Sequence, residues 1–173
     1  MKIALQIVII LCAFLAIGKA EEATPLGNEI ISDISSGRVD YVKVFLTKEG
    51  AEYVVSLNEE KLEKWGTTVT IKKFSQHKAT PLLLKVLQSL RLNSKIENLD
   101  LRCGCKFFDS QGKIIHTLYI DNFLTRGKFD GKQVIISKKI KDWIDAVRNE
   151  LNQKSETIPA QGAKRDDYRG PEP

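Results

Sequence analysis

A long β-hairpin between Leu99 and Asp121 is the feature of this sequence that most constrains its fold. Two apolar runs, both rich in β-branched and aromatic residues, flank Asp109–Gly112, a polar turn that ends in glycine. The hairpin contains both cysteines that lie beyond the N-terminal apolar segment and one of the two histidines. An isolated hairpin is marginally stable, so we expect the flanking segments to extend its sheet and to cover it with helices.

The flanking segments carry the patterns of further strands and of three helices. The longest helix has an apolar stripe with helical spacing from Ile140 to Leu151, and Ser137 is its N-cap. The other predicted elements are strands at Tyr41–Leu46, Glu52–Leu57, Thr67–Phe74 and Lys132–Ile136, a short helix at Glu59–Trp65 and a leucine-rich helix from Thr80 to Leu92. We expect the first two strands to form a hairpin, and Asn122–Gly131 to be a glycine-rich turn region. This order predicts a single α+β domain, with a mostly antiparallel sheet of about five to six strands and two longer helices and one short helix packed on it.

Residues 1–20 have the composition of a secretory signal peptide. Lys2 precedes an apolar run that starts at Ile3, and the small residues Gly18 and Ala20 form a cleavage site before Glu21. The run is near the lower length limit of a membrane-spanning helix, so an uncleaved anchor is the alternative. We expect cleavage after Ala20, export to the periplasm or the extracellular space, and no stable membrane span afterwards.

The mature chain divides into three parts by composition. Residues 21–37 mix Pro, Gly and Ser with few apolar residues and predict a flexible N-terminal arm, with at most a helical turn at Glu29–Ile34. Residues 38–153 carry the apolar patterns and predict the globular domain. Residues 154–173 are polar, contain three prolines and predict a disordered tail.

Charge and cysteine content narrow the class of partner. The chain has 27 basic and 22 acidic residues and a net charge of +5, which falls to +3 when Lys2 and Lys19 leave with the signal peptide. So mild a charge on an exported protein predicts no nucleic-acid partner. Cys103 and Cys105 are the only cysteines left after cleavage, too few for a disulfide scaffold, and a domain of this size can rely on its apolar core.

The Cys103-Gly104-Cys105 motif is the one candidate for chemistry. In a regular strand, residues i and i+2 point to the same face about 6.6 Å apart. A disulfide needs Cβ atoms about 3.8 Å apart, so it would require a kink at Gly104 and would be strained. Three soft ligands, the two thiols and the imidazole of His116, resemble part of a zinc or copper(I) site if the hairpin register brings them together.

The register of the hairpin decides where His116 lies. If Phe108 pairs with Lys113 across a four-residue loop, His116 stands opposite Cys105, and one face of the hairpin is nearly all apolar. If Asp109 pairs with Lys113 through a glycine bulge, both faces become half polar. A slip of one residue exchanges every side chain between the faces, so the cleaner apolar split favours the first register.

A structural role is the alternative for Cys103, Cys105 and His116. Free cysteine is among the most buried residue types, and a histidine on the same face is then a hydrogen-bonded core residue. The metal site also lacks a fourth ligand unless His77 or a partner supplies one, and C-x-C is not the C-x₂-C spacing of common zinc sites. We therefore expect buried thiols and no cofactor. Accessible, reactive thiols would favour the chemical alternative.

The remaining residues do not form a recognisable catalytic set. Two histidines without a serine on a strand–turn–helix elbow do not make a Ser-His-Asp site. The segment Gly127–Gly131 lacks the Gly-Lys-Ser/Thr ending of a phosphate-binding loop. These observations favour an exported, non-enzymatic binding protein, of the inhibitor or immunity type, whose partner is another protein or an envelope component. The alternative function is thiol redox or soft-metal handling by the cysteine hairpin.

Overall fold

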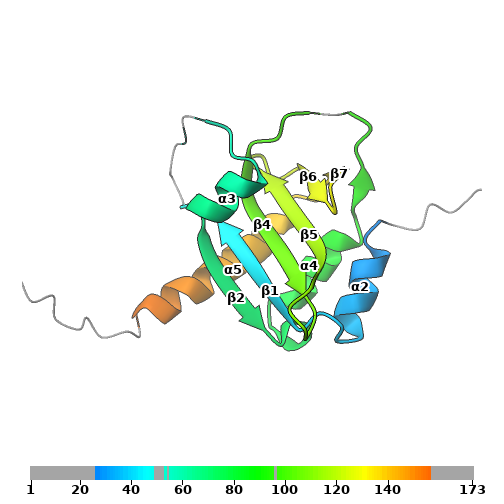
Figure 1. The fold of residues 1–173 in the computed structure, drawn as a ribbon, viewed down its shortest axis with the longest axis vertical. Helices are drawn as coiled ribbons and strands as arrows, with labels where there is room; N and C mark the ends of the chain where they lie inside the picture. Colours follow the sequence, from blue (N-terminus) through cyan, green and yellow to red (C-terminus); the bar gives the residue numbers. More distant parts are fainter. Residues whose placement is uncertain (1–25, 49–52, 54, 96, 157–173) are drawn as a thin grey trace, which may run out of the picture.

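The chain forms a single α+β domain around one antiparallel sheet (Figure 1). A computed structural model describes residues 26–48, 53, 55–95 and 97–156, with the backbone alone for 154–156. The seven strands lie in the order β2-β1-β4-β5-β6-β7-β3. They are β1 (Tyr41–Leu46), β2 (Thr67–Lys72), β3 (Arg91–Leu92), β4 (Leu101–Phe108), β5 (Ile114–Asp121), β6 (Arg126–Phe129) and β7 (Lys132–Ile135). The predicted fold class is confirmed, although the sheet has more strands than predicted.

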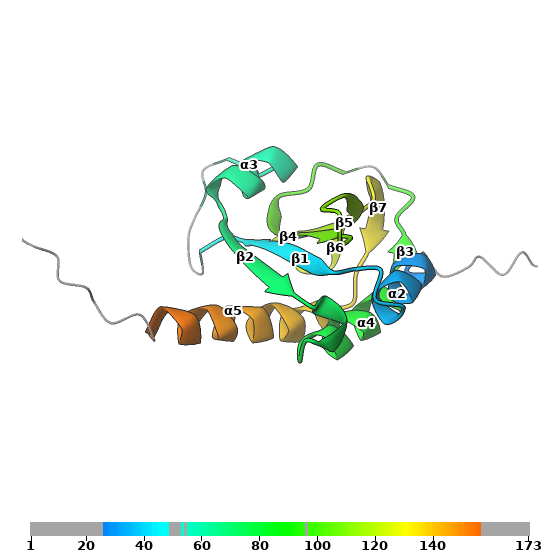
Figure 2. The same cartoon turned by 60° about the horizontal axis from the view of Figure 1, so that its bottom comes forward.

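Helices cover the two faces of the sheet unequally (Figure 2). Three lie on one side, namely α2 (Asn28–Ser35), α4 (Thr80–Leu87) and α5 (Ile140–Glu156), and a single 3₁₀ turn, η1 (Phe74–Gln76), precedes α4. Of the helices in the described residues, only the short α3 (Glu59–Trp65) lies on the other side. The main core therefore forms on the side of the three helices.

The predicted apolar stripe of α5 supplies much of this main core. Ile140, Trp143, Ile144 and Val147 are all buried against the sheet, and Trp143 is fully buried. The burial of each such side chain stabilises the fold by about 1.5–3 kcal/mol. The periodicity that predicted the helix thus also identified the face that packs.

A smaller apolar cluster lies beneath α3 on the opposite face. It consists of Phe45, Leu57, Leu62, Leu99, Leu101 and Tyr119. The side chain of Asn58 accepts a hydrogen bond from the backbone N–H of Lys61 at 2.9 Å, so it caps α3 as predicted. Leu62 is the only buried residue of this helix. The helix therefore covers only part of its face of the sheet, near one end (Figure 1).

β4 and β5 form the predicted central hairpin, but the favoured register is wrong. Cys105 pairs with Leu118 rather than with His116, and His116 pairs with Phe107. The turn uses the alternative closure, in which the Asp109 N–H donates to the carbonyl of Lys113 at 3.0 Å. A β-bulge beside Phe107 then adds one more residue on β5. The bulge returns Cys105 and His116 to one face, so the predicted face is correct where the predicted pairing is not.

The predicted hairpin between Tyr41–Leu46 and Glu52–Leu57 is not formed. β1 pairs instead with β2 and β4, both distant in sequence. Part of the second segment lies outside the described residues, and its described part contains no strand. Leu57 bonds to the start of β4 and to the residue before it. Its carbonyl accepts from the N–H of Leu101 at 2.9 Å, and its N–H donates to the side chain of Asp100 at 2.9 Å.

Three further segments differ from the sequence prediction. The leucine-rich helix ends at Leu87, and the following Arg91–Leu92 form the edge strand β3. The segment predicted as a glycine-rich turn region contains β6. The segment predicted as a flexible arm contains α2, whose Ile30 and Ile34 are buried in the main core. The folded part of the chain therefore starts before Arg38.

Two of the predicted segments lie largely or wholly beyond the described residues. These are the signal peptide, 1–20, and the tail, 154–173, of which α5 includes only the first residues. In the part of the chain that the structure describes, no helix is long and apolar enough to cross a membrane.

Candidate functional site

Cys103 and Cys105 are free thiols buried on the core-facing side of β4. Burial raises the pKa of the Cys103 thiol to about 12, although the positive charge of Arg148 opposes the shift. Burial, followed by the neighbouring Cys103, also raises the pKa of Cys105 well above its usual value. The Cys105 thiol donates to the carbonyl of Leu118, with 3.6 Å between sulfur and oxygen. Both groups stay protonated near neutral pH, and a protonated thiol is a poor nucleophile and a poor metal ligand.

His116 lies on the same face as the thiols but contacts two carboxylates. Its Nδ1 lies 2.8 Å from Oδ2 of Asp130, in the turn after β6, and its Nε2 lies 3.1 Å from Oδ2 of Asp33 on α2. The ring is 4% exposed and stacks on Phe129. Burial alone would lower the pKa of His116, but the hydrogen bonds and charges of Asp130 and Asp33 outweigh it and raise the pKa above 6.5. A protonated His116 then donates one N–H to each carboxylate and ties α2 to the sheet.

The structure does not bring the predicted soft ligands together. His77, the candidate fourth ligand, has its Nε2 2.7 Å from Oε2 of Glu150 on α5, and its Nδ1 accepts from the N–H of Ala79 at 3.2 Å. Among the described residues, no group of three or more His, Cys, Asp and Glu side chains is placed to hold a metal ion. The two histidines instead connect helices to the rest of the fold.

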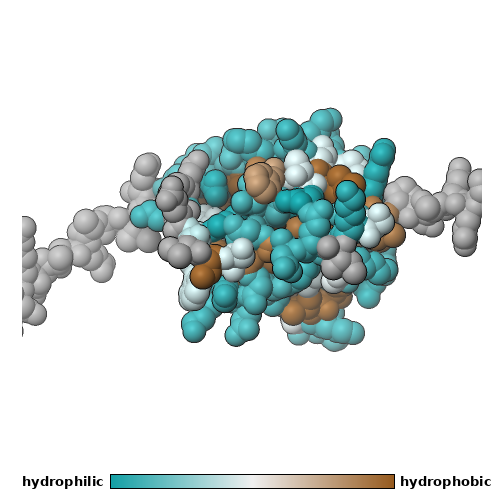
Figure 3. All heavy atoms as spheres, turned by 90° about the horizontal axis from the view of Figure 1, so that it is seen from above, coloured by the Kyte–Doolittle hydropathy of each residue, from teal (hydrophilic) through white to brown (hydrophobic). Residues whose placement is uncertain are grey.

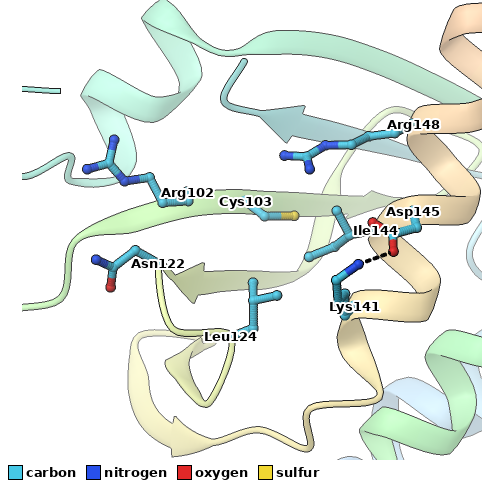
Figure 4. Close-up of a pocket in the computed structure, with 8 residues that line it drawn as sticks. All are labelled: Arg102, Cys103, Asn122, Leu124, Lys141, Ile144, Asp145 and Arg148. Carbon is cyan, nitrogen blue, oxygen red and sulfur yellow. Dashed lines mark hydrogen bonds and ion pairs between the residues drawn. The ribbon is translucent and has the colours of Figure 1, made fainter. Parts of the chain in front are cut away.

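A small pocket of about 180 Å³ opens beside Cys103, between β4, α5 and the turn after β5 (Figure 4). Arg148 and Ile144 reach from α5 toward β4, the strand that carries Cys103. The guanidinium group of Arg102, on the same strand, points away from the Cys103 sulfur. Lys141 is paired with Asp145 at 2.5 Å. The pocket is smaller than the about 300–1,000 Å³ typical of ligand sites, and several of its charges are already matched within the fold. We therefore assign it no ligand.

The other candidate site is the part of the sheet that α3 leaves uncovered. The strand registers arrange its side chains in two rows across β2, β1, β4 and β5. One row consists of Lys72, Tyr41, Phe108 and Ile114, and the next consists of Thr70, Lys43, Lys106 and Thr117. We call these eight residues the open half-face. They alternate along each strand with side chains of the main core, so they lie on the opposite face of the sheet from that core.

Aromatic and cationic side chains dominate the open half-face. The rings of Tyr41 and Phe108 stack with centroids 4.6 Å apart, and Nζ of Lys43 lies 5.3 Å from the centroid of Phe108. Ile114 is 44% exposed at the end of the same row. Lys106 is paired with Glu63 of α3 at 2.5 Å, whereas Lys43 and Lys72 form no ion pair with the described residues. Phe108 itself is buried, at 7% exposed, so the accessible part of the open half-face consists of Tyr41, Ile114 and polar or cationic side chains and is net positive.

The end of the molecule seen from above has a different character (Figure 3). Its apolar residues form separate patches within a hydrophilic surface. Separate apolar residues of this kind are normal on the surface of a folded domain and do not by themselves indicate a binding site.

The sequence prediction missed both Asp33 and the open half-face. Ile30, Asp33 and Ile34 have the i, i+3, i+4 spacing of one helical face, so a carboxylate on that face could have predicted a buried cationic partner. The open half-face had no comparable signal, because it is assembled from four strands whose pairing depends on two bulges and on a non-local partner for β1.

In comparisons with known proteins, no family model, no curated protein and no solved structure matches the chain.

Proposed function

We propose that this chain is an exported, non-enzymatic binding protein that contacts its partner through the open half-face. The observation that carries the proposal is the unequal covering of the sheet. Among the described residues, three helices bury one face, whereas α3 covers only one end of the other. The partner in this proposal is another protein or an envelope component.

The composition of the open half-face suits contact with a partner better than contact with water alone. Tyr41 is half-buried and stacks on the buried ring of Phe108, which holds it in place, and aromatic residues are enriched at protein interfaces. Ile114 adds an exposed aliphatic side chain beside them. Lys43 and Lys72 supply positive charges that can select and orient a partner of opposite charge.

The candidate chemical residues support a binding role over a thiol role. Cys103 and Cys105 are buried, unpaired by a disulfide, and have raised pKa values. His116 is held between two carboxylates rather than beside a thiol. These side chains therefore stabilise the fold, and no observation on the described residues favours redox or metal handling as a second function.

Export is part of the proposal and rests on the sequence of residues 1–20. N-terminal sequencing of the exported protein tests it directly, with Glu21 expected as the first residue. A product that retains Met1 in a membrane fraction would contradict it.

Co-purification tests the binding role. We expect the tagged mature protein to retain a partner from the native envelope, and Lys43→Glu combined with Lys72→Glu to abolish retention. The matched control reverses the charge of Lys85 and Lys139, which are exposed outside the open half-face. Equal retention by both double variants, at unchanged thermal midpoints, would show that the open half-face is not the binding surface.

A further inference from the structure

We infer that the outer edge of β2 binds an extended acidic segment of the partner as an additional strand of the sheet. This inference rests on the proposed binding function and names the chemistry and conformation of the partner. It is carried by three properties of β2: an outer edge that no described strand pairs with, a regular β-favouring sequence, and cations at both of its ends.

Backbone pairing shows which groups of β2 face outward. The Thr47 N–H donates to the carbonyl of Arg102 at 3.0 Å, so Thr47 bonds toward β4. Alternate residues of an antiparallel strand bond to opposite neighbours. Leu46, Val44 and Val42 therefore bond toward β2, where their register partners are Thr67, Val69 and Ile71.

The intervening residues of β2 must then direct their backbone groups away from β1. These residues are Thr68, Thr70 and Lys72, and all three are exposed. Among the described residues, β2 has no strand on this outer side, and it marks one margin of the sheet in Figure 1. Their N–H and C=O groups form a row of donors and acceptors that an extended peptide can pair with.

Apart from Lys72 at its end, β2 lacks the features that normally protect an edge strand. It is six residues long, contains no proline and pairs with β1 without a bulge. Its side chains alternate between exposed and buried at Val69 and Ile71. An added strand would continue this alternation, with polar side chains beside the open half-face and apolar side chains on the side of α5.

The charges around β2 select an acidic segment. Lys72 and Lys73 lie at its end, and both are exposed. At its start, a groove of about 350 Å³ is lined by Thr67, Lys48 and Arg148 together with Leu46 and Leu151. The strand itself contains no acidic residue. Glu or Asp on the polar side of the added strand would meet Lys72 across the strand pair, where opposite charges stabilise the pairing.

Peptide titration followed by NMR tests the inference. Two capped peptides of about eight residues, one alternating Glu with Val and one alternating Lys with Val, are added to the ¹⁵N-labelled mature protein. We expect saturable shifts and slowed amide exchange at Thr68, Thr70 and Lys72 with the Glu/Val peptide alone. Thr70→Pro removes one outward N–H and also replaces the side chain, whereas Thr70→Val replaces the side chain and keeps the N–H. Thr70→Pro should therefore bind the Glu/Val peptide about tenfold or more weakly than Thr70→Val.

Thr70→Pro is expected to fold, because proline is tolerated where the N–H of an edge strand faces solvent. Unchanged NMR resonances of β4 and β5 in Thr70→Pro would confirm that this variant folds. Lys72→Glu gives a second test, in which the binding preference should change to the Lys/Val peptide. Equal binding of both peptides, no saturation at about 1 mM, or full binding by Thr70→Pro would overturn the inference. Protection of the same amides that grows with protein concentration alone would also overturn it, in favour of a second copy at this edge.

The effects of the lysine changes and of Thr70→Pro on partner retention distinguish a failure of this inference from a failure of the proposed binding function. Partner retention could depend on Lys43 and Lys72 but not change with Thr70→Pro. This result would support the binding function and contradict the inference of an added strand. If neither the change of Lys43 and Lys72 nor Thr70→Pro reduces partner retention, the proposed binding function itself is wrong.

Discussion

His116 is the residue whose charge matters most for the fold. It is buried between Asp130 and Asp33, which lie on different elements, and each carboxylate accepts one of its N–H groups when the ring is protonated. Arg38 also contacts Asp33, at 3.2 Å, so the carboxylate on α2 is shared between two cations. Loss of the His116 proton would leave one carboxylate facing a ring nitrogen that cannot donate.

The first prediction concerns the pH dependence of stability. The pKa of folded His116 is raised above 6.5, the value expected in the unfolded chain. Its contribution is therefore fully present below 6.5 and is lost as the pH rises through the higher folded pKa. We expect the difference in unfolding free energy between the wild type and His116→Gln to shrink as the pH is raised above 6.5.

Chemical denaturation across this pH range measures that difference. Lys113→Gln, an exposed substitution beside the same strand, is the control and should run parallel to the wild type. We call the contacts of protonated His116 with Asp33 and Asp130 the His116 clamp. A constant difference in unfolding free energy between the wild type and His116→Gln would show that this clamp does not stabilise the fold.

The second prediction concerns the thiols. Because Cys103 and Cys105 are buried and have raised pKa values, a thiol reagent should label the native protein far more slowly than the unfolded protein. Changing both residues to Ala should destabilise the fold by about 1–3 kcal/mol through lost burial. Changing both to Ser should cost more, since two buried hydroxyls would need partners. Rapid labelling of both native thiols would instead favour the redox alternative.

Among the elements, α2 gives the clearest test of where the domain begins. Its Ile30 is fully buried, and a Cβ added at Gly27 would lie 2.1 Å from the carbonyl oxygen of Leu87, so the helix packs tightly on α4. Ile30→Ala should destabilise the protein by about 2–5 kcal/mol, whereas Glu29→Ala, on the exposed side, should be nearly neutral. Thermal unfolding of both variants measures this. Equal midpoints would restore the flexible arm that composition alone predicted.

Local sequence signals predicted the elements better than their pairing. The stripe of α5 and the Asn58 cap of α3 depend on residues within one or two turns of each other, so both could be found from the sequence. The hairpin register could not, because the bulge beside Phe107 reflects packing across the sheet. β6 was missed because it is short and includes Gly127, where an added Cβ would lie 2.0 Å from the carbonyl oxygen of Tyr119.

The candidate site was predictable to the same limited extent. The Cys103-Gly104-Cys105 strand and the shared face of His116 were found from alternation alone. The partners of His116 could not be found, because Asp33 is 83 residues away in the sequence. The open half-face depends on β1 pairing with both β2 and β4, and the local hairpin signal of β1 pointed to another partner.

At the scale of the whole molecule, the stabilising contacts and the proposed binding surfaces lie on different parts of the fold. The main core, the thiols and the His116 clamp lie on the side of the three helices, where burial and paired charges stabilise the domain. The exposed residues of the open half-face and of the outer edge of β2, unlike the buried Phe108, lie where a substitution removes little packing. Variants of these surfaces should therefore change binding with small effects on stability.

Site-specific photo-crosslinking tests the central claim most directly. A photoreactive residue at Ile114, in the open half-face, is compared in the native envelope with one at Lys85, which is exposed on α4. We predict a discrete protein adduct from position 114, none from position 85, and loss of the adduct when Lys43 and Lys72 are changed to Glu. Adducts of equal yield from both positions, or an adduct from position 85 alone, would contradict the assignment of the open half-face as the binding surface.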